Sequence, residues 1–162
     1  MAEKFVRIDD RLYHGQTAAV WLPLKKPQSI VIADDFASKD YTTQLMIKIA
    51  VPKTVNLVIK NIVDAAKYIK ENENENMFVI VRHPKAMLQL LEEGFVVDKI
   101  NLGNISNSKS ETGRKTLLKN IHVEQNDVDC IRKIAEKGVR VEIQLVPDDI
   151  PIDAIDLLNK NY

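Results

Sequence analysis

Short apolar runs alternate with longer amphipathic segments along most of the chain. The short runs are rich in β-branched residues, and each predicts a strand: 5–8, 29–33, 55–59, 77–81, 99–102, 120–123 and 139–146. Apolar residues between the runs recur at helical spacing and predict helices over 15–22, 39–50, 61–71, 84–94 and 124–137, with a last helix from Pro151. Because the strands are near-continuous apolar runs, we expect helices on both sheet faces. The prediction is an α/β fold with an open, doubly wound, mostly parallel sheet of about seven strands.

Prolines and glycines set several of the expected boundaries. Pro23 is expected to end the first helix, Pro84 begins a later helix at a favoured first-turn position, and Gly94 ends that helix. The polar stretch 103–116 lacks strong periodicity, which is typical of a functional loop or a loosely ordered surface segment. No repeat or shift in composition divides the chain, so one domain is expected over residues 1–162.

Composition narrows the class of protein. The 23 basic residues balance the 23 acidic residues, so the chain lacks the basic excess usual in nucleic-acid-binding domains. A single cysteine, Cys130, excludes an internal disulfide and a multi-cysteine metal site. No apolar run reaches the roughly 20 residues of a membrane span, and the first residues lack the apolar core of a signal peptide. A soluble cytoplasmic protein is expected.

The densest group of candidate chemical residues follows the first strand, in the segment RIDDRLYHGQ at 7–16. His14 lies at or near the start of the expected helix, where free backbone N–H groups and the helix dipole favour an anion. A neutral imidazole can act as a nucleophile, and Arg11 can hold a phosphoryl group through two parallel hydrogen bonds. The segment therefore indicates a phosphoryl site that needs no metal. The glycine-rich nucleotide-binding motifs are absent from the sequence.

This segment closely resembles the phosphorylation loop of the mannose–fructose–sorbose type IIB components of the bacterial phosphoenolpyruvate-dependent sugar phosphotransferase system. The family pattern R-x-D-D-R-L-x-H-G-Q is met throughout residues 7–16. The resemblance continues through IVIADD at 30–35, NLG at 101–103, GVRVEI at 138–143 and VP at 146–147. Two positions depart from the family: Tyr13 replaces an aliphatic residue, and Asn104 follows Gly103 where a second glycine is common.

The resemblance implies a role for each matching residue. His14 would be the transiently phosphorylated residue, Arg11 would steady the phosphoryl group, and Gly15 and Gln16 would form the loop-to-helix segment around it. The implied activity is that of a protein-N(pi)-phosphohistidine–sugar phosphotransferase, without a cofactor. A IIA partner would donate the group, and the sugar would be carried by membrane partners IIC and IID, with which the protein would associate peripherally.

Two other functions fit parts of the sequence. Acidic residues follow the first two strands, at 9–10 and 34–35, and could form the Mg²⁺ site of a receiver-like domain phosphorylated on aspartate. That interpretation needs an aspartate after the third strand, which runs instead into Lys60 and Asn61. The carboxylates are expected to orient Arg11, cap turns or repel a wrong protein surface, with Asp10 and Asp35 as candidate supporting residues. The second alternative is a non-catalytic regulatory module that binds a small anion at the same helix start.

The remaining candidates have simpler interpretations. His83 precedes a helix and is expected to be an ordinary loop residue, and His122 is expected to be structural. Trp21 is expected to pack the first helix against the sheet, and Cys130 to lie in the core. The basic residues of the polar stretch are expected at a solvated surface; they are Lys109, Arg114 and Lys115.

Overall fold

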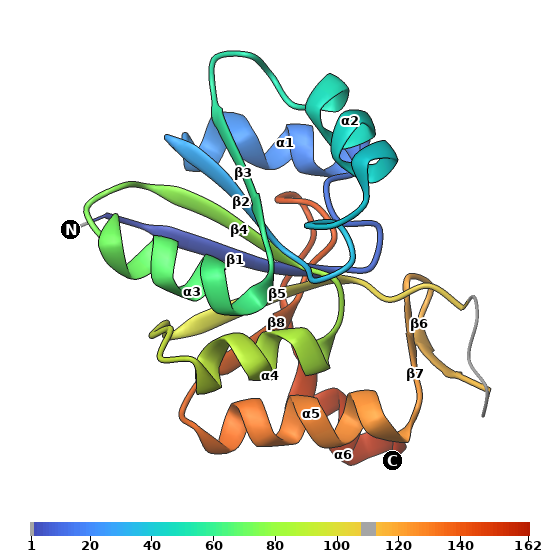
Figure 1. Cartoon of the computed structure of the whole chain (residues 1–162). Helices are drawn as coiled ribbons and strands as arrows, with labels where there is room; N and C mark the ends of the chain where they lie inside the picture. Colours follow the sequence, from blue (N-terminus) through green and yellow to red (C-terminus); the bar gives the residue numbers. More distant parts are fainter. Residues whose placement is uncertain (1, 108–112) are drawn as a thin grey trace.

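A seven-stranded sheet forms the centre of the computed structural model, which describes residues 2–107 and 113–162 (Figure 1). The strand order is β3-β2-β4-β1-β5-β8-β9, and neighbours are parallel except for the β8–β9 pair. The strands are β1 (Lys4–Asp9), β2 (Ser29–Ala33), β3 (Asn56–Lys60), β4 (Met77–Val81), β5 (Lys99–Asn104), β8 (Arg140–Ile143) and β9 (Ile152–Asp153). The predicted open, mostly parallel sheet is confirmed.

Helices cover both faces of this sheet. The helices are α1 (Gly15–Lys25), α2 (Tyr41–Ala50), α3 (Ile62–Glu71), α4 (Pro84–Glu92), α5 (Gln125–Glu136) and α6 (Ala154–Asn161). In Figure 1, α1 and α2 lie on one side of the sheet and the other four helices lie on the opposite side. Each side has its own apolar cluster, because successive strand residues point to opposite faces. Ile30 and Ile32 pack toward α1 and α2, whereas Val31 and Ala33 pack toward the other helices.

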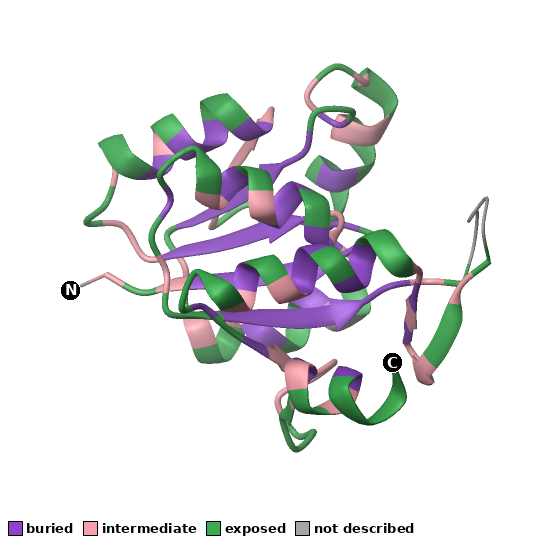
Figure 2. Cartoon of the chain, turned by 90° about the horizontal axis from the view of Figure 1, so that it is seen from below, coloured by how far each residue is buried: buried purple, intermediate pink, exposed green. Residues whose placement is uncertain are grey.

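Burial follows this layering. Every residue of β2 and β4 is buried, which explains why these segments are uninterrupted apolar runs in the sequence. Figure 2 shows the buried strands enclosed by helices whose outer surfaces are exposed. Within the part of the chain described, no helix combines the length and the apolar composition that crossing a bilayer requires.

One predicted strand lies outside the main sheet. Residues 121–123 form β7 (Ile121–Val123), which pairs with β6 (Lys115–Leu118) in a separate antiparallel hairpin. The seventh strand of the main sheet is β9, which pairs with β8 and is only two residues long, too short for an apolar pattern to predict it. The polar stretch 103–116 is therefore not a continuous loop, since Gly103 and Asn104 end β5 and Lys115 begins β6.

Two predicted helix boundaries are wrong. The helix α1 continues through Pro23 to Lys25, because a proline in the last turn removes only one backbone hydrogen bond, to the exposed Ala19. The last helix begins at Ala154 rather than near Pro151, with the Asp153 side chain accepting a hydrogen bond from the Asp156 backbone N–H. The two residues between Pro151 and Ala154 form β9 instead, because they pair with β8.

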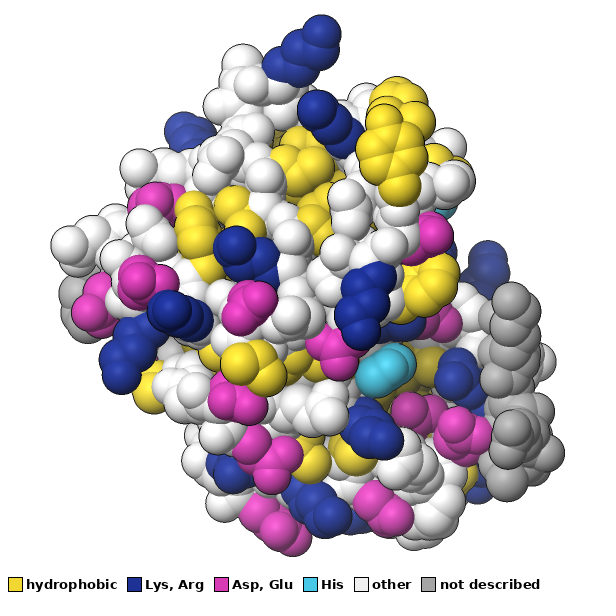
Figure 3. Space-filling view, viewed as in Figure 1, with side chains coloured by type: hydrophobic (Ala, Val, Ile, Leu, Met, Phe, Trp, Pro, Cys, Tyr) yellow, Lys and Arg dark blue, Asp and Glu magenta, His cyan; other side chains and the backbone are white. Residues whose placement is uncertain are grey.

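The apolar stripe on α2 faces outward. Tyr41, Leu45 and Ile49 recur at helical spacing and form one face of the helix, but they are 75%, 43% and 77% exposed. Ile47 is the buried residue of this helix. Figure 3 shows hydrophobic side chains gathered over α2, while acidic and basic side chains are interspersed over the rest of this face. The described residues thus form no extended basic patch on this face, in keeping with the balanced charge of the chain.

Trp21, Cys130 and His122 have structural roles, as expected, whereas His83, expected to be an ordinary loop residue, caps a helix. Trp21 is buried between α1 and the sheet, with its ring centroid 4.6 Å from that of Phe5. Cys130 is buried in α5. His83 is the residue preceding α4, and its Nδ1 accepts a hydrogen bond from the Ala86 backbone N–H at 3.1 Å, so it caps the helix. His122 contacts Thr116 across the β6–β7 hairpin.

Candidate functional site

The loop after β1 lies where the chain crossings change direction. The connection from β1 leads through α1 on one face of the sheet, whereas the connection from β5 to β8 passes α5 on the opposite face. The strands β1 and β5 are neighbours. In open α/β sheets, ligands bind beyond the carboxyl ends of strands at such a switch point. The topology therefore places residues 9–16 at the position where a ligand site is expected.

Strand β1 brings two charged side chains to the α1 face. Phe5, Arg7 and Asp9 alternate with Val6 and Ile8, so their side chains point to the same side of the sheet. Arg7 and Asp9 are both 1% exposed. Buried charges need partners, and these two residues form an ion pair with an N–O distance of 3.2 Å.

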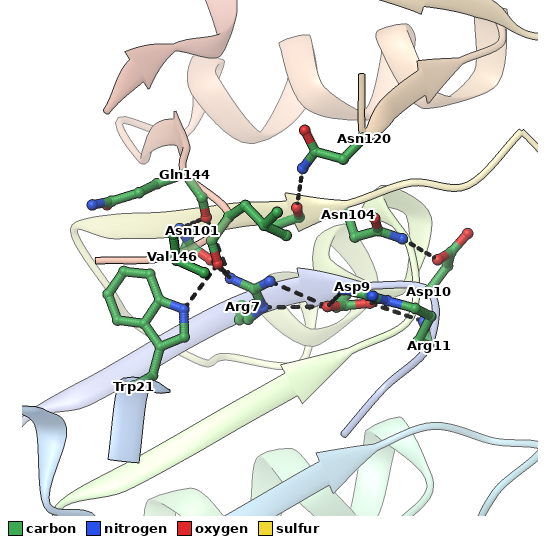
Figure 4. A network of polar contacts seen from close by, with 12 residues as sticks. Arg7, Asp9, Asp10, Arg11, Trp21, Asn101, Asn104, Asn120, Gln144 and Val146 are labelled. Atoms are coloured by element: carbon green, nitrogen blue, oxygen red, sulfur yellow. Dashed lines mark hydrogen bonds and ion pairs between the residues drawn. The ribbon is translucent and has the colours of Figure 1, made fainter. Parts of the chain in front are cut away.

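Arg7 is held from both ends of its guanidinium group (Figure 4). Its Nη1 donates to the Asn101 side-chain oxygen at 2.7 Å and to the backbone oxygens of Gln144 and Leu145 at 3.3 and 3.1 Å. Its Nε and Nη2 donate to the Asp9 carboxylate at 3.4 and 3.2 Å. Burial lowers the pKa of the Arg7 guanidinium, and the charge and hydrogen bonds of Asp9 act against that shift.

Gly103 leaves the space that the Arg7 guanidinium occupies. A Cβ atom at position 103 would lie 2.2 Å from Cζ of Arg7 and 2.4 Å from its Nη2. Two residues earlier on the same strand, Asn101 pairs in register with Arg7 and contacts it. Any larger residue at position 103 would therefore displace the buried cation.

Asp9 lies between two arginines. Its Oδ1 accepts hydrogen bonds from the backbone N–H and Nε of Arg11, both at 3.0 Å, and its Oδ2 accepts from Nη2 of Arg11 at 3.0 Å. The same Oδ2 accepts the bonds from Arg7. Figure 4 shows the resulting row Arg7, Asp9, Arg11 running along β1 into the loop. A carboxylate thus contacts Arg11, which is one of the three alternatives expected for the acidic residues; it is that of Asp9, whereas the expected supporting residues are Asp10 and Asp35.

The loop then turns sharply toward α1. Leu12 adopts a left-handed backbone with φ of 57°, which costs a non-glycine residue about 1–2 kcal/mol. The side chains of Leu12 and Tyr13 are 3% and 6% exposed and join the apolar cluster beneath α1, so their burial offsets this strain. Burial also raises the pKa of the Tyr13 hydroxyl. The two apolar anchors leave His14 half-buried as the residue that precedes α1.

His14 begins α1 as expected. Its backbone is extended, with φ of −106°, and its carbonyl accepts the first helical hydrogen bond from Ala18 at 2.8 Å. Gly15 and Gln16 follow in the first turn and are exposed. A Cβ added to Gly15 would meet no heavy atom within 4 Å, so there is open space at the start of the helix. The N–H groups of a first helical turn can bind an anion placed in such a space.

Asp10 ties the loop to the end of β5. Its carboxylate accepts hydrogen bonds from the Asn104 side chain at 2.8 Å and from the backbone and hydroxyl of Ser106 at 2.7 and 2.9 Å. Arg114 is half-buried and donates to the Ser106 backbone oxygen at 2.6 Å, so it is not the solvated residue expected. Lys115 is exposed, and Lys109 lies outside the described residues. Asn104, which stands where a second glycine is common in the family, thus holds the loop directly through Asp10.

Arg82 links the acidic pair at 9–10 to the acidic pair at 34–35. Arg82 forms a two-bond contact with Asp34 at 3.1 and 2.9 Å, and its Nη1 donates to the Asp10 backbone oxygen at 3.2 Å. Asp35 accepts a hydrogen bond from the backbone N–H of Ile62 at the start of α3. Among the described residues, no three histidine, cysteine or acidic side chains are grouped closely enough to hold a metal ion.

Several residues that build this site have no role predicted from the sequence. Arg7 belongs to the recognised pattern, and its presence inside an apolar strand is a signal that it has buried partners. Asn101, Ser106 and Arg82 join it from other strands and loops. No local pattern identifies them, because their contacts with residues 7–10 span 72 to 96 positions.

Comparison with known proteins shows the family of this chain. The family model for "PTS system sorbose subfamily IIB component" matches residues 3–162. The chain belongs to this family. The N-acetylgalactosamine-specific phosphotransferase enzyme IIB component 1 of Escherichia coli is 30% identical over 155 residues, covering 88% of this chain and 90% of that protein. The mannose-specific EIIAB component of E. coli is 28% identical over 95% of this chain and 47% of that protein.

The fold is also that of a solved IIB domain. The crystal structure of the IIBSor domain of the sorbose permease from Klebsiella pneumoniae superimposes with a TM-score of 0.91. The match covers 100% of this chain and 99% of that one at 24% sequence identity, so it supports the fold. The family match, rather than this structural similarity, shows that the IIB component is a phosphotransferase of the sugar phosphotransferase system, which fits a phosphocarrier role.

Proposed function

We propose that this IIB component carries a phosphoryl group on His14, accepting it from a phosphohistidine of a IIA component and passing it to a sugar hydroxyl. The observation that carries the proposal is the position of His14 at the exposed start of α1, three residues after an arginine held in place by Asp9. The mannose-specific relative named EIIAB supports a IIA partner, because this chain aligns with about half of it.

The proposed reaction has two transfer steps, in which the groups around His14 have different roles. In the first step, the N–P bond of the donor breaks as a new N–P bond forms to the imidazole of His14. In the second step, that bond and the O–H bond of the sugar hydroxyl break as a P–O bond forms to the sugar, and the hydroxyl proton passes to the released imidazole nitrogen or to water. Phosphoryl transfer depends mainly on positioning and on charge stabilisation. Arg11 supplies the positive charge, and the backbone N–H groups of Gly15 and Gln16 donate hydrogen bonds to the phosphoryl oxygens. No cofactor is part of this proposal.

Asp10 and Asp35 support the site indirectly. Asp10 fixes the loop to Asn104 and Ser106, and Asp35 fixes the β2–α2 connection to the start of α3. We propose that residues 1–162 act as one domain, which works in the cytoplasm and associates peripherally with IIC and IID membrane partners that carry the sugar. Phosphorylation of His14 at the N(pi) position is part of the same proposal.

Reconstituted phosphorylation tests the proposal. The protein is incubated with phosphoenolpyruvate, the two general phosphocarrier proteins and a IIA component, and then with membranes and a panel of sugars. His14→Ala should remove phosphate incorporation while the fold survives, and His122→Ala is the matched control that should keep it. The adduct should be acid-labile and alkali-stable, as expected of a P–N bond.

Three outcomes would contradict the assignment. Full incorporation by a folded His14→Ala protein would move the phosphorylated residue elsewhere. An alkali-labile adduct would favour the receiver-like alternative with an aspartyl phosphate. Binding of inorganic phosphate without uptake of a phosphoryl group from phosphorylated IIA would favour a regulatory module that only binds an anion.

A further inference from the structure

The carboxylate of Asp9 is shared unequally between its two arginine partners. Oδ1 accepts only from Arg11 among the contacts described, through its backbone N–H and Nε, both at 3.0 Å. Oδ2 accepts from Nη2 of Arg11 at 3.0 Å and from Nη2 and Nε of Arg7 at 3.2 and 3.4 Å. Arg7 lies behind Asp9, on the side away from Arg11 (Figure 4). A change at Arg7 therefore reaches Arg11 through one shared oxygen.

These three side chains also form a small group of charges. Two guanidinium groups and one carboxylate carry a combined formal charge of +1. Arg7 and Asp9 are each 1% exposed, so water screens their interaction weakly. Without Arg7, the same carboxylate would face Arg11 as its single ionic partner in the row, and the combined charge would be zero. A neutral pair of side chains attracts a phosphoryl dianion less strongly than a group of three side chains with a combined charge of +1.

We propose that Arg7 is a positioning residue for phosphoryl transfer: it orients Asp9 and offsets its charge, so that Arg11 is held in place with its charge directed to the phosphoryl group. This inference rests on the proposed function of His14. Arg7 itself is buried beneath the loop and is fixed by Asn101 and by the segment that follows β8. Its contribution is transmitted through Asp9 rather than made by touching the phosphoryl group.

A pair of variants separates charge from structure. Arg7→Met keeps much of the side-chain volume and removes the cation, leaving Asp9 and Arg11 as a neutral pair. The double variant Arg7→Met/Asp9→Asn also removes the carboxylate, so Arg11 again supplies a combined charge of +1. The amide oxygen of the introduced asparagine can replace Oδ1, which accepts two of the three Arg11 bonds.

Single-turnover transfer from phosphorylated IIA is the measurement. We expect Arg7→Met to lower the transfer rate at saturating IIA by about tenfold or more, since small misplacements at a reacting centre have large effects. The concentration of IIA at half-saturation should stay unchanged, because Arg7 lies away from the surface. The double variant should return to within about threefold of the wild-type rate. A double variant no faster than Arg7→Met would overturn the proposal.

Trp21→Phe is the control for a merely structural effect. The Trp21 Nε1 donates to the Leu145 backbone oxygen at 3.1 Å, which is the same oxygen that accepts from Arg7. This variant loosens the segment after β8 but leaves the Arg7–Asp9–Arg11 row intact. It should lower the melting temperature slightly and keep the transfer rate. Transfer as slow as that of Arg7→Met would show that Arg7 acts through this segment and not through Asp9.

The design also covers a failure to fold. Arg7→Met leaves a buried carboxylate with one partner fewer, whereas the double variant leaves no carboxylate behind. If only the double variant folds, its rate alone decides: near wild type supports the proposal, and a loss of about tenfold or more overturns it. Wild-type protein that takes no phosphoryl group on His14 would instead contradict the proposed function, so the two failures are distinguishable.

Discussion

Replacing Gly103 with alanine places a methyl group where the Arg7 guanidinium lies. The new Cβ would be 2.2 Å from Cζ, 2.4 Å from Nη2 and 2.6 Å from Nε of Arg7. Carbon atoms in contact are separated by about 3.5–4.0 Å, so the guanidinium must move by more than about 1 Å. It cannot swing into solvent, because its Nη1 is held by Asn101, Gln144 and Leu145 and the side chain is buried.

The size of the effect follows from the bonds that this movement breaks. The contacts of Arg7 with Asp9 are already 3.2 and 3.4 Å long, and a further shift removes them. A lost hydrogen bond between charged groups costs about 1.5–3 kcal/mol, and overpacking of a filled interior costs about 1–3 kcal/mol. Because the two effects overlap, we expect Gly103→Ala to lower the free energy of unfolding by about 2–4 kcal/mol. For a chain of this length, the melting temperature should fall by about 5–15 °C.

Gly15→Ala is the matched control. A Cβ at position 15 meets no heavy atom within 4 Å, so this variant should melt within about 2 °C of wild type. Both variants are unfolded by heat and by urea and followed by circular dichroism. Equal melting temperatures for Gly103→Ala and Gly15→Ala would refute the argument that the guanidinium fills the space over Gly103.

Two further predictions concern Arg11 and His83. Arg11→Lys keeps the charge but loses the two-bond contact with Asp9, so transfer from phosphorylated IIA should slow by about 10- to 100-fold. A lowered melting temperature with an unchanged rate would remove Arg11 from the active site. Burial lowers the pKa of His83 below its ordinary value of 6.5, so the unfolded chain takes up the proton first and stability falls as the pH drops below about 6.5. His83→Asn keeps a cap for α4 without titrating, and its urea stability should fall less than that of wild type between pH 7 and pH 5; equal slopes would contradict this origin.

Much of the fold is determined by local pattern. The apolar runs at 29–33 and 77–81 coincide with β2 and β4, because buried central strands leave no room for polar residues. The segment 7–16 likewise identifies the family and the candidate site, because a loop that binds a phosphoryl group needs its residue types at fixed spacing. These features depend on neighbours in the chain, so they can be predicted from it.

Other features depend on partners far away in the chain. The apolar stripe of α2 gives no sign that it faces outward, since periodicity indicates which residues share a face but not what covers them. The segment 121–123 has the pattern of a strand, but pairing with β6 places it outside the main sheet.

The buried charged residues of the site show most clearly which features depend on local sequence and which depend on partners far away in the chain. The sequence by itself determined that Arg7, Asp9 and Arg11 occur at alternate positions and that a glycine lies at 103. Only the tertiary structure placed Gly103 under the Arg7 guanidinium and Asp9 between the two arginines. The physical reason is that a buried charge is stable only where several strands bring its partners together, and strand pairing, not local sequence, sets which residues meet.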